Sequence, residues 1–196
     1  MLTHEPAIRR INAAFTPDPD DAFAWWALAT RQLTLDGCDF DIKPMHIQDI
    51  NRGCMRQEID IGAISSAVWP LIHKNYVMLS AGASVGRNYG PALVARRNAA
   101  DPSAGTRVAI PGEHTTGALL LRLFFPGVQT IEMPFDKIAG AVCNGQVQAG
   151  VLIHEELLNW KAMGLRRVCC LGQRWSQETQ LPLPVGLNVA HKRLGA

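Results

Sequence analysis

The sequence predicts an α/β protein built as two lobes, with mainly parallel sheets flanked by helices. Strand-like and helix-like segments alternate along almost the whole chain, which is the pattern of parallel sheets covered by helices on both faces. The composition changes around residues 98–106 to small, polar and turn-forming residues, and a second series of strands and helices follows. The last segment, residues 181–195, has an extended pattern with no helix after it.

The first half opens with a strand pattern at residues 8–15 and a proline-rich turn. A helix follows, because Phe23, Trp26, Ala27 and Thr30 recur at helical spacing. The other expected strands are 38–47, 59–66, 76–80 and 91–97, and the other expected helices are 48–58 and 67–74. The glycine-rich stretch 81–90 separates the last two of these strands.

The second half repeats this alternation and has clearer helix ends. Gly145 and Gly164 follow helical patterns, and glycine commonly ends a helix in the left-handed conformation. The expected strands are 107–112, 128–133, 149–154 and 166–172, and the expected helices are 114–125, 134–145, 155–164 and 173–180.

These patterns predict the domain organisation. We expect a first lobe at 1–97, a second lobe at 98–185 and a return crossing toward the first lobe at 186–196. Because no helix closes the last segment, the first lobe is expected to be incomplete at its carboxyl end.

The composition indicates a globular protein and excludes several classes of function. Of the 196 residues, 47% are hydrophobic and 18% are charged, and the formal net charge is +2. The arginine pairs are widely separated, so no basic face predicts nucleic-acid binding. The start of the chain lacks the apolar core of a signal peptide, and no window approaches the ~18 apolar residues of a membrane helix. We expect a cytoplasmic protein with no membrane partner.

Cysteine and histidine spacing argues against a metal site. The five cysteines are odd in number and lack C-x-x-C spacing, which indicates reduced thiols rather than disulfides or a zinc site. Four residues after His154 the chain has Leu158, so the H-E-x-x-H pattern of metalloproteases fails.

The first candidate site is the stretch IPGEHTTGALLL, residues 110–121. A strand, a tight turn at Pro111 and Gly112, and then His114, Thr115 and Thr116 place two hydroxyls at a helix start, where unpaired N–H groups can hold a carboxylate or phosphate. The alternative is simple helix capping by threonine, which these residues alone favour.

The second candidate is His154, at the end of an expected strand. The plain alternative is a histidine whose ring bonds backbone near a helix start. Its position favours a functional role, because the carboxyl ends of strands in open α/β sheets line ligand clefts and Thr115 and Thr116 are expected at the same edge.

Three further stretches are weaker candidates. Asp18, Asp20 and Asp21 lie in the turn before the first helix, where paired carboxylates can do acid–base work but an aspartate is also an ordinary cap. Capping is favoured there. Ser65, together with Ser66, ends the third strand, and Gly90 lies in a glycine-rich turn where backbone can approach a ligand.

A family likeness is carried by six stretches: TPDPDDAF, IDIGAISS, YVMLSAGASVGRNYGP, VAIPGEHTTGALLL, AGVLIHE and GLRRVCCLGQRWSQETQLPLPVG. Together they resemble the 1,4-dihydroxy-6-naphthoate synthases of the futalosine pathway of menaquinone biosynthesis. The resemblance implies a type II periplasmic-binding-protein-like fold with the ligand between two lobes. It also implies conversion of cyclic dehypoxanthinyl futalosine into 1,4-dihydroxy-6-naphthoate.

The resemblance also implies roles for single residues. His154 matches the histidine of the family's Ile-His-Glu motif, thought to act as the base. Thr115 and Thr116 match its paired threonines, and Ser65 matches the serine after the third strand. The expected substrate-binding residues are Thr115, Thr116, Ser65, Gly112 and Gly90.

The first turn departs from the family pattern. The family usually has Ser-Pro-Cys-Pro-Asn-Asp-Thr-Phe there, whereas this chain has Thr16, Asp18, Asp20 and Ala22 at four of those positions. Two carboxylates are therefore added close to the expected substrate.

The sequence as a whole favours a cofactor-free carbon–carbon lyase acting on a small carboxylated substrate, with His154 as base. Two alternatives stay open: a solute-binding protein of the same fold that binds a small carboxylated ligand, and an inactive paralogue. Whether the protein forms a homodimer is also left open.

Overall fold

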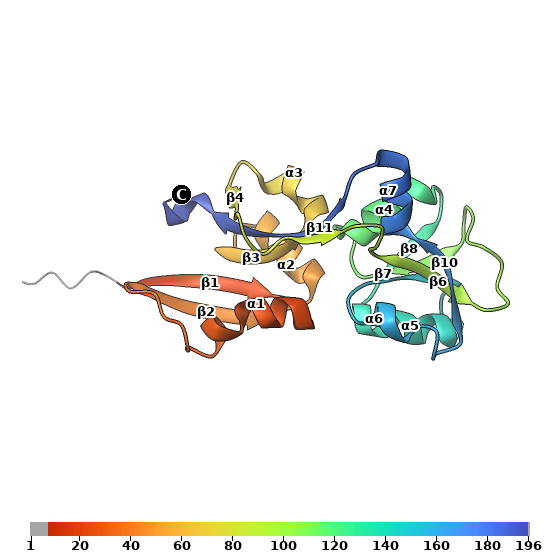
Figure 1. The fold of residues 1–196 in the computed structure, drawn as a ribbon, viewed down its shortest axis with the longest axis horizontal. Helices are drawn as coiled ribbons and strands as arrows, with labels where there is room; N and C mark the ends of the chain where they lie inside the picture. The colour runs from red at the N-terminus through yellow and green to blue at the C-terminus, as the bar shows by residue number, and fades with distance from the viewer. Residues whose placement is uncertain (1–7, 196) are drawn as a thin grey trace, which may run out of the picture.

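The computed structural model describes residues 8–195, which form two lobes, each with its own mixed sheet and helices on both sides (Figure 1). The first sheet has the strand order β2-β1-β3-β11-β4, with β5 also paired to β11. Its strands are β1 (Arg9–Phe15), β2 (Cys38–Pro44), β3 (Ile61–Ser65), β4 (Tyr76–Met78), β5 (Ser84–Gly86) and β11 (Leu183–His191). The helices of this lobe are α1 (Pro19–Ala29), α2 (Ile47–Met55) and α3 (Trp69–Ile72), with the 3₁₀ turns η1 (Ser66–Val68) and η2 (Lys192–Leu194).

The second sheet has the order β10-β6-β9-β7-β8. Its strands are β6 (Ala92–Arg96), β7 (Arg107–Ile110), β8 (Gln129–Glu132), β9 (Ala149–Leu152) and β10 (Leu165–Cys170). The helices of this lobe are α4 (Thr116–Phe124), α5 (Phe135–Cys143), α6 (Glu156–Asn159) and α7 (Leu171–Thr179).

Alternate side chains of the second sheet fill a separate core on each face. Leu93 and Ala95 of β6 pack with apolar residues of α4 and α7, whereas Val94 packs with residues of α5. This follows from the strand period of two, which sends successive side chains to opposite faces. The apolar runs of β6, β7 and β9 therefore indicate strands that are buried on both faces.

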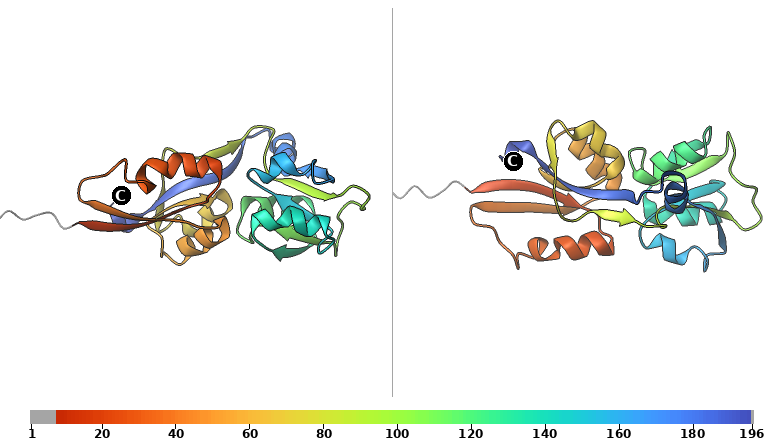
Figure 2. Two further views of the ribbon diagram at one scale, coloured as in Figure 1. Left: turned by 90° about the horizontal axis from the view of Figure 1, so that it is seen from below. Right: turned by 45° about the horizontal axis from the view of Figure 1, so that its top comes forward.

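The chain crosses between the lobes twice, and the two crossings pair with each other through β5 and β11 (Figure 2). One crossing runs from β5 to β6, and the other enters β11, where Leu183 and Pro184 pair with Gly86 and Val85 of β5. The strand β6 pairs in the second sheet, whereas residues 92–96 were predicted to lie in the first lobe. The composition break at 98–106 falls in the loop between β6 and β7, where the chain turns within the second lobe rather than crossing between lobes.

The expectation of mainly parallel sheets is wrong, because the sheets are mixed. Four strand pairings are parallel and five are antiparallel. The parallel pairs β1–β2, β1–β3, β7–β8 and β7–β9 arise from strand–helix–strand connections, as the alternation predicts. The antiparallel pairs all involve β6 or β11, the strands that enter each lobe from the other one. The α/β class with helices on both faces is confirmed.

Most expected elements are present, with two differences. The helix expected at 155–164 is only the single turn α6, and its Leu158 is 81% exposed, so its apolar residues do not form one continuous buried stripe. The strand β5 lies inside the glycine-rich stretch that was expected to be irregular. Gly145 has φ of 74° directly after the cap residue of α5, as predicted for a helix end.

The fold brings four strand ends to one place. The end of β3 and the segments that follow β1, β7 and β9 all contribute to one cavity between the lobes. Within residues 8–195 the longest helix is α1, with 11 residues, and no helix there is long and apolar enough to span a membrane.

Candidate active site

A cavity of about 380 Å³ lies between the two lobes. Five of the six predicted site residues line it: Ser65, Gly90, Thr115, Thr116 and His154. The sixth, Gly112, does not. The cavity is in the size range of small-molecule sites, and it lies at carboxyl ends of strands, where α/β sheets hold their ligands.

His154 follows β9 and has an unusual backbone. Its φ is 54°, in the left-handed region that residues other than glycine seldom adopt. The imidazole Nδ1 lies 3.3 Å from Oδ2 of Asp18, and the ring packs edge-on against Phe135 with the ring centroids 5.1 Å apart. Nε2 is buried and has no hydrogen-bond partner among residues 8–195. The ring therefore faces a carboxylate rather than backbone, unlike the plain alternative drawn from the sequence.

Asp18 contacts His154, and this contact was not predicted from the sequence. Asp18 is fully buried and caps α1, since its Oδ1 accepts a hydrogen bond of 3.0 Å from the backbone N–H of Asp21. The capping interpretation is thus confirmed. Its Oδ2 also accepts a hydrogen bond from the hydroxyl of Thr16 and faces His154. The positions of Asp18 and His154 in the sequence could have indicated this contact, because both residues follow strands that end at the cavity.

Asp20 adds a second carboxyl beside this pair. Hydrogen bonding to Asp18, burial and the charge of Asp18 raise the pKa of Asp20, and the nearby His154 acts in the opposite direction. One donor atom each from Asp18, Asp20 and His154 lies within 4.8 Å of the others. Two oxygens and a nitrogen are suitable ligands for a divalent ion. Oδ2 of Asp18, however, already has Thr16 and His154 as partners, so we describe the trio as a carboxylate–imidazole network.

Burial also raises the pKa of Tyr89, another residue at the cavity, and the charges of Asp20 and then Cys170 add to this effect. The phenol of Tyr89 therefore stays protonated in the range where enzymes work. It can serve the cavity as a neutral hydrogen-bonding group.

The hydroxyls of Thr115 and Thr116 both bind protein groups. Thr115 caps α4, with its Oγ1 accepting from the N–H of Ala118 at 3.2 Å and donating to the carbonyl of Gly112 at 2.7 Å. The capping interpretation is confirmed for this residue.

Thr116 has a different partner set. Its Oγ1 donates to the carbonyl of Val185 at 2.8 Å and accepts from the N–H of Ala67 at 3.3 Å. The N–H groups of Thr116 and Gly117 have no acceptor among residues 8–195, as expected for the first turn of a helix. These N–H groups, rather than the hydroxyls, are the free donors at the cavity.

Ser65 and Gly112 are positioned by α2. Asn51, fully buried on that helix, accepts from the N–H of Ser65 at 3.0 Å and donates to its Oγ at 3.1 Å. Gly112 packs on Gln48, where an added Cβ would lie 2.3 Å from Oε1. The polar pair Gln48 and Asn51, three residues apart on a helix with a buried face, was the signal that could have revealed this support.

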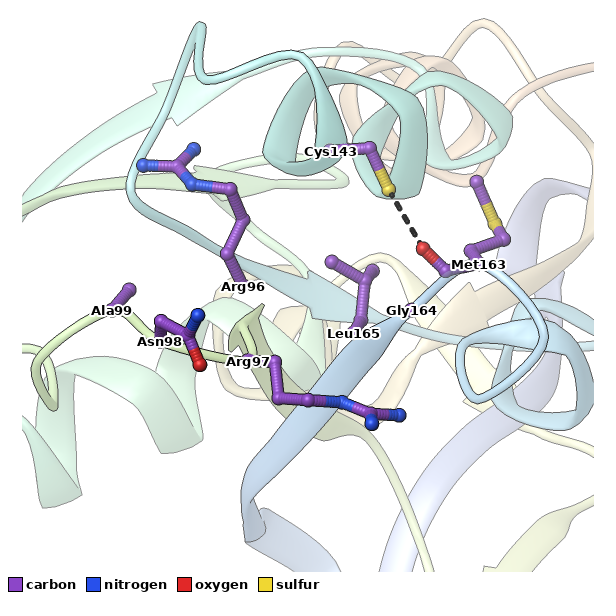
Figure 3. A pocket seen from close by; sticks show the side chains of 8 residues that line it. All are labelled: Arg96, Arg97, Asn98, Ala99, Cys143, Met163, Gly164 and Leu165. Carbon is purple, nitrogen blue, oxygen red and sulfur yellow. Dashed lines mark hydrogen bonds between the residues drawn. The ribbon is translucent and has the colours of Figure 1, made fainter.

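Gly90 lines the cavity where the crossing meets α7, and an added Cβ there would lie 3.0 Å from Cα of Gly172. A second hollow, of about 410 Å³, lies in the second lobe and is lined by residues 96–99, Cys143 and residues 163–165 (Figure 3). Its Arg96 is engaged with the carbonyl of Val142 at 2.9 Å, and Cys143 donates to the carbonyl of Met163. None of the predicted site residues lies there, so the interlobe cavity is the functional candidate.

The fold and the cavity define a class of protein in which two α/β lobes hold a ligand between them. The alkanesulfonate-binding protein of Xanthomonas axonopodis pv. citri has the same fold, with a TM-score of 0.69 at 14% identity over 97% of this chain and 68% of that one. A protein of Archaeoglobus fulgidus is more similar, with a TM-score of 0.84 and 39% identity over 93% of this chain and 68% of that one.

This chain belongs to the menaquinone biosynthesis family, because the model of that family matches residues 11–196. Two curated relatives bear the name 1,4-dihydroxy-6-naphtoate synthase. The one from Thermus thermophilus is 33% identical over 94% of this chain and 67% of its own length. The one from Streptomyces coelicolor is 34% identical over 95% of this chain and 67% of its own length. The resemblance inferred from the sequence is confirmed.

Proposed function

We propose that this protein is a carbon–carbon lyase that converts cyclic dehypoxanthinyl futalosine into 1,4-dihydroxy-6-naphthoate. The names of its two curated relatives give this product. The observation that carries the proposal is the imidazole of His154 next to a buried carboxylate at the interlobe cavity, which the start of α4 with its free N–H groups also lines. The reaction is proposed to take place in the cytoplasm, without a cofactor, on a small carboxylated substrate.

In the proposed reaction, different groups that line the cavity have different roles. The N–H groups at the start of α4 hold the substrate carboxylate, since a helix amino terminus favours an anion. Ser65 and the backbone at Gly90 shape the wall on which the rest of the substrate lies. Thr115 and Thr116 act by fixing the helix start through the hydrogen bonds of their hydroxyls.

His154 is proposed to take a proton from the substrate. A neutral imidazole suits this task, because it accepts a proton near neutral pH. Nδ1 lies 3.3 Å from Oδ2 of Asp18, and with the proton on Nδ1 the lone pair resides on Nε2, which has no partner among residues 8–195 and which a ligand would satisfy.

The test is direct. The purified protein is incubated with cyclic dehypoxanthinyl futalosine, and formation of 1,4-dihydroxy-6-naphthoate is followed by mass spectrometry. We expect turnover that persists in EDTA and falls about 10²–10⁴-fold in His154→Asn, which keeps a polar side chain but cannot titrate. Thr34→Val, an exposed change in the first lobe, serves as the matched control. Absence of product from the parent protein, or equal rates for parent and His154→Asn, would refute the proposed role.

A solute-binding role is the second candidate, because the fold is shared with an alkanesulfonate-binding protein. Calorimetric titration separates the two functions. Tight binding of the carboxylated substrate without any product would favour the binding role, and it would equally fit the inactive paralogue to which the changed first turn points.

A further inference from the structure

His154 and Asp18 come from different lobes. His154 follows β9 of the second lobe, and Asp18 precedes α1 of the first. Their contact, 3.3 Å between Nδ1 and Oδ2, is therefore made across the interlobe boundary. Asp18 is completely buried, so bulk water does not compete for this oxygen.

The two oxygens of Asp18 have separate partners. Capping of α1 uses Oδ1, through the backbone N–H of Asp21. Oδ2 faces the imidazole and the hydroxyl of Thr16, which also reaches Oδ2 of Asp21 at 2.7 Å. Because the cap needs one oxygen only, the second oxygen is available to the histidine.

We propose that Asp18 is a positioning residue for His154, holding the imidazole in the Nδ1–H tautomer so that the Nε2 lone pair is kept for the ligand. A buried carboxylate can only accept hydrogen bonds, so the nitrogen facing it must carry the proton. Phe135 packs against the ring, and the left-handed backbone of His154 fixes the direction of its side chain. The catalytic consequence rests on the proposed function, but the tautomer itself does not.

Of the other charged side chains near the pair, Asp20 lies nearby, with one carboxyl oxygen within 4.8 Å of donor atoms of Asp18 and His154, but it forms no ion pair with the imidazole among residues 8–195. The elements packed against His154 also carry Asp20, Asp21, Asp136, Lys137, Glu155 and Glu156. Within residues 8–195, the ion pair of the imidazole is with Asp18 alone. Oδ2 of Asp21 accepts a hydrogen bond of 3.1 Å from the backbone N–H of Thr16, and it lies 2.7 Å from the hydroxyl whose single proton it shares with Asp18.

Asp18→Asn is the decisive variant because it preserves shape and the cap. Its amide oxygen can still accept from the N–H of Asp21, and its NH₂ group then points at Nδ1 of His154. A donor in that position requires an unprotonated Nδ1 and moves the proton to Nε2. Asp18→Ser is the matched second variant, since serine caps a helix well but is too short to reach the imidazole.

Two readouts test the proposal on the intact protein. The first is ¹⁵N NMR of the histidine rings under conditions where they are neutral, with the His154 signals assigned among six histidines by their loss in His154→Asn. We expect a protonated Nδ1 in the parent, a protonated Nε2 in Asp18→Asn, and a mixture in Asp18→Ser. The second is turnover, where kcat should fall roughly 10²-fold in Asp18→Asn while KM changes little.

The outcomes separate the two proposals. If parent and Asp18→Asn show the same tautomer, or if Asp18→Asn and Asp18→Ser both retain parental kcat, Asp18 is only a cap and the positioning role is refuted. If the tautomer changes as expected but the parent forms no product, the positioning role stands and the proposed lyase activity fails.

Discussion

The hydroxyl of Thr116 is expected to stabilise the contact between the two lobes. It donates to the carbonyl of Val185, in β11 of the first sheet, and accepts from the N–H of Ala67, in η1. Thr116 itself begins α4 of the second lobe and is 4% exposed. Thr116→Val keeps the shape of the side chain and removes both hydrogen bonds.

The magnitude follows from what the substitution leaves behind. The carbonyl of Val185 and the N–H of Ala67 are partly buried and lose their partner, and an unsatisfied buried group costs about 1–3 kcal/mol. Because water can reach part of this region, we expect a total loss of about 1–3 kcal/mol from the free energy of unfolding. With an m-value of about 2 kcal/mol/M, the urea midpoint falls by roughly 0.5–1.5 M.

Urea titration followed by tryptophan fluorescence and circular dichroism measures this loss. Thr34→Val is again the control, since Thr34 is exposed and its change should stay within about 0.5 kcal/mol. If Thr116→Val unfolded at the same urea concentration as Thr34→Val, the hydroxyl would have no structural role. The threonine would then have to be explained by ligand contact alone.

Three more outcomes follow from the site and the core. Gly112→Ala should lower the free energy of unfolding by about 1–3 kcal/mol, since φ is 154° and the new Cβ meets Gln48; an unchanged melting temperature would contradict this. Burial raises the pKa of the Cys54 thiol to about 12, so a thiol reagent at about pH 8 should modify Cys54 only after unfolding, as mapped by mass spectrometry. The pKa of Asp20 is raised in the folded state. Ionised Asp20 therefore lowers the free energy of unfolding, and this loss develops as the pH rises above the pKa that Asp20 has in the unfolded chain. Asp20→Asn should therefore stabilise the protein near pH 7 by about 0.5 kcal/mol and change little in strong acid, as measured by urea titration at both pH values.

The sequence was informative wherever a structure depends on neighbours in the chain. The strand and helix order follows from local periodicity, and the end of α5 follows from the glycine at position 145. The cap of α4 by Thr115 and the cap of α1 by Asp18 also depend on residues three positions away, so both could be predicted.

Contacts between distant segments could not be predicted in the same way. The antiparallel direction of β6 and β11 depends on the path between lobes, which no local pattern records. Five of the six expected site residues reached the cavity because strand ends meet there, but the contact of Asp18 with His154 joins positions 136 residues apart in number. The support of Ser65 by Asn51 requires the tertiary packing of α2 on β3.

The place of β11 in the first sheet has a consequence for how the chain folds during synthesis. All five strands of the second sheet lie between residues 92 and 170, so this lobe can complete its hydrogen bonding as one continuous stretch. The first sheet, in contrast, has β11 between β3 and β4, and β4 has no other strand partner among residues 8–195. Since domains generally fold as units while the chain emerges, the later-made lobe should form first and the earlier-made lobe should wait for the last strand. A ribosome-bound chain halted once residues up to about 180 have left the exit tunnel would therefore be expected to carry a protease-resistant second lobe joined to a first lobe that is still open to cleavage.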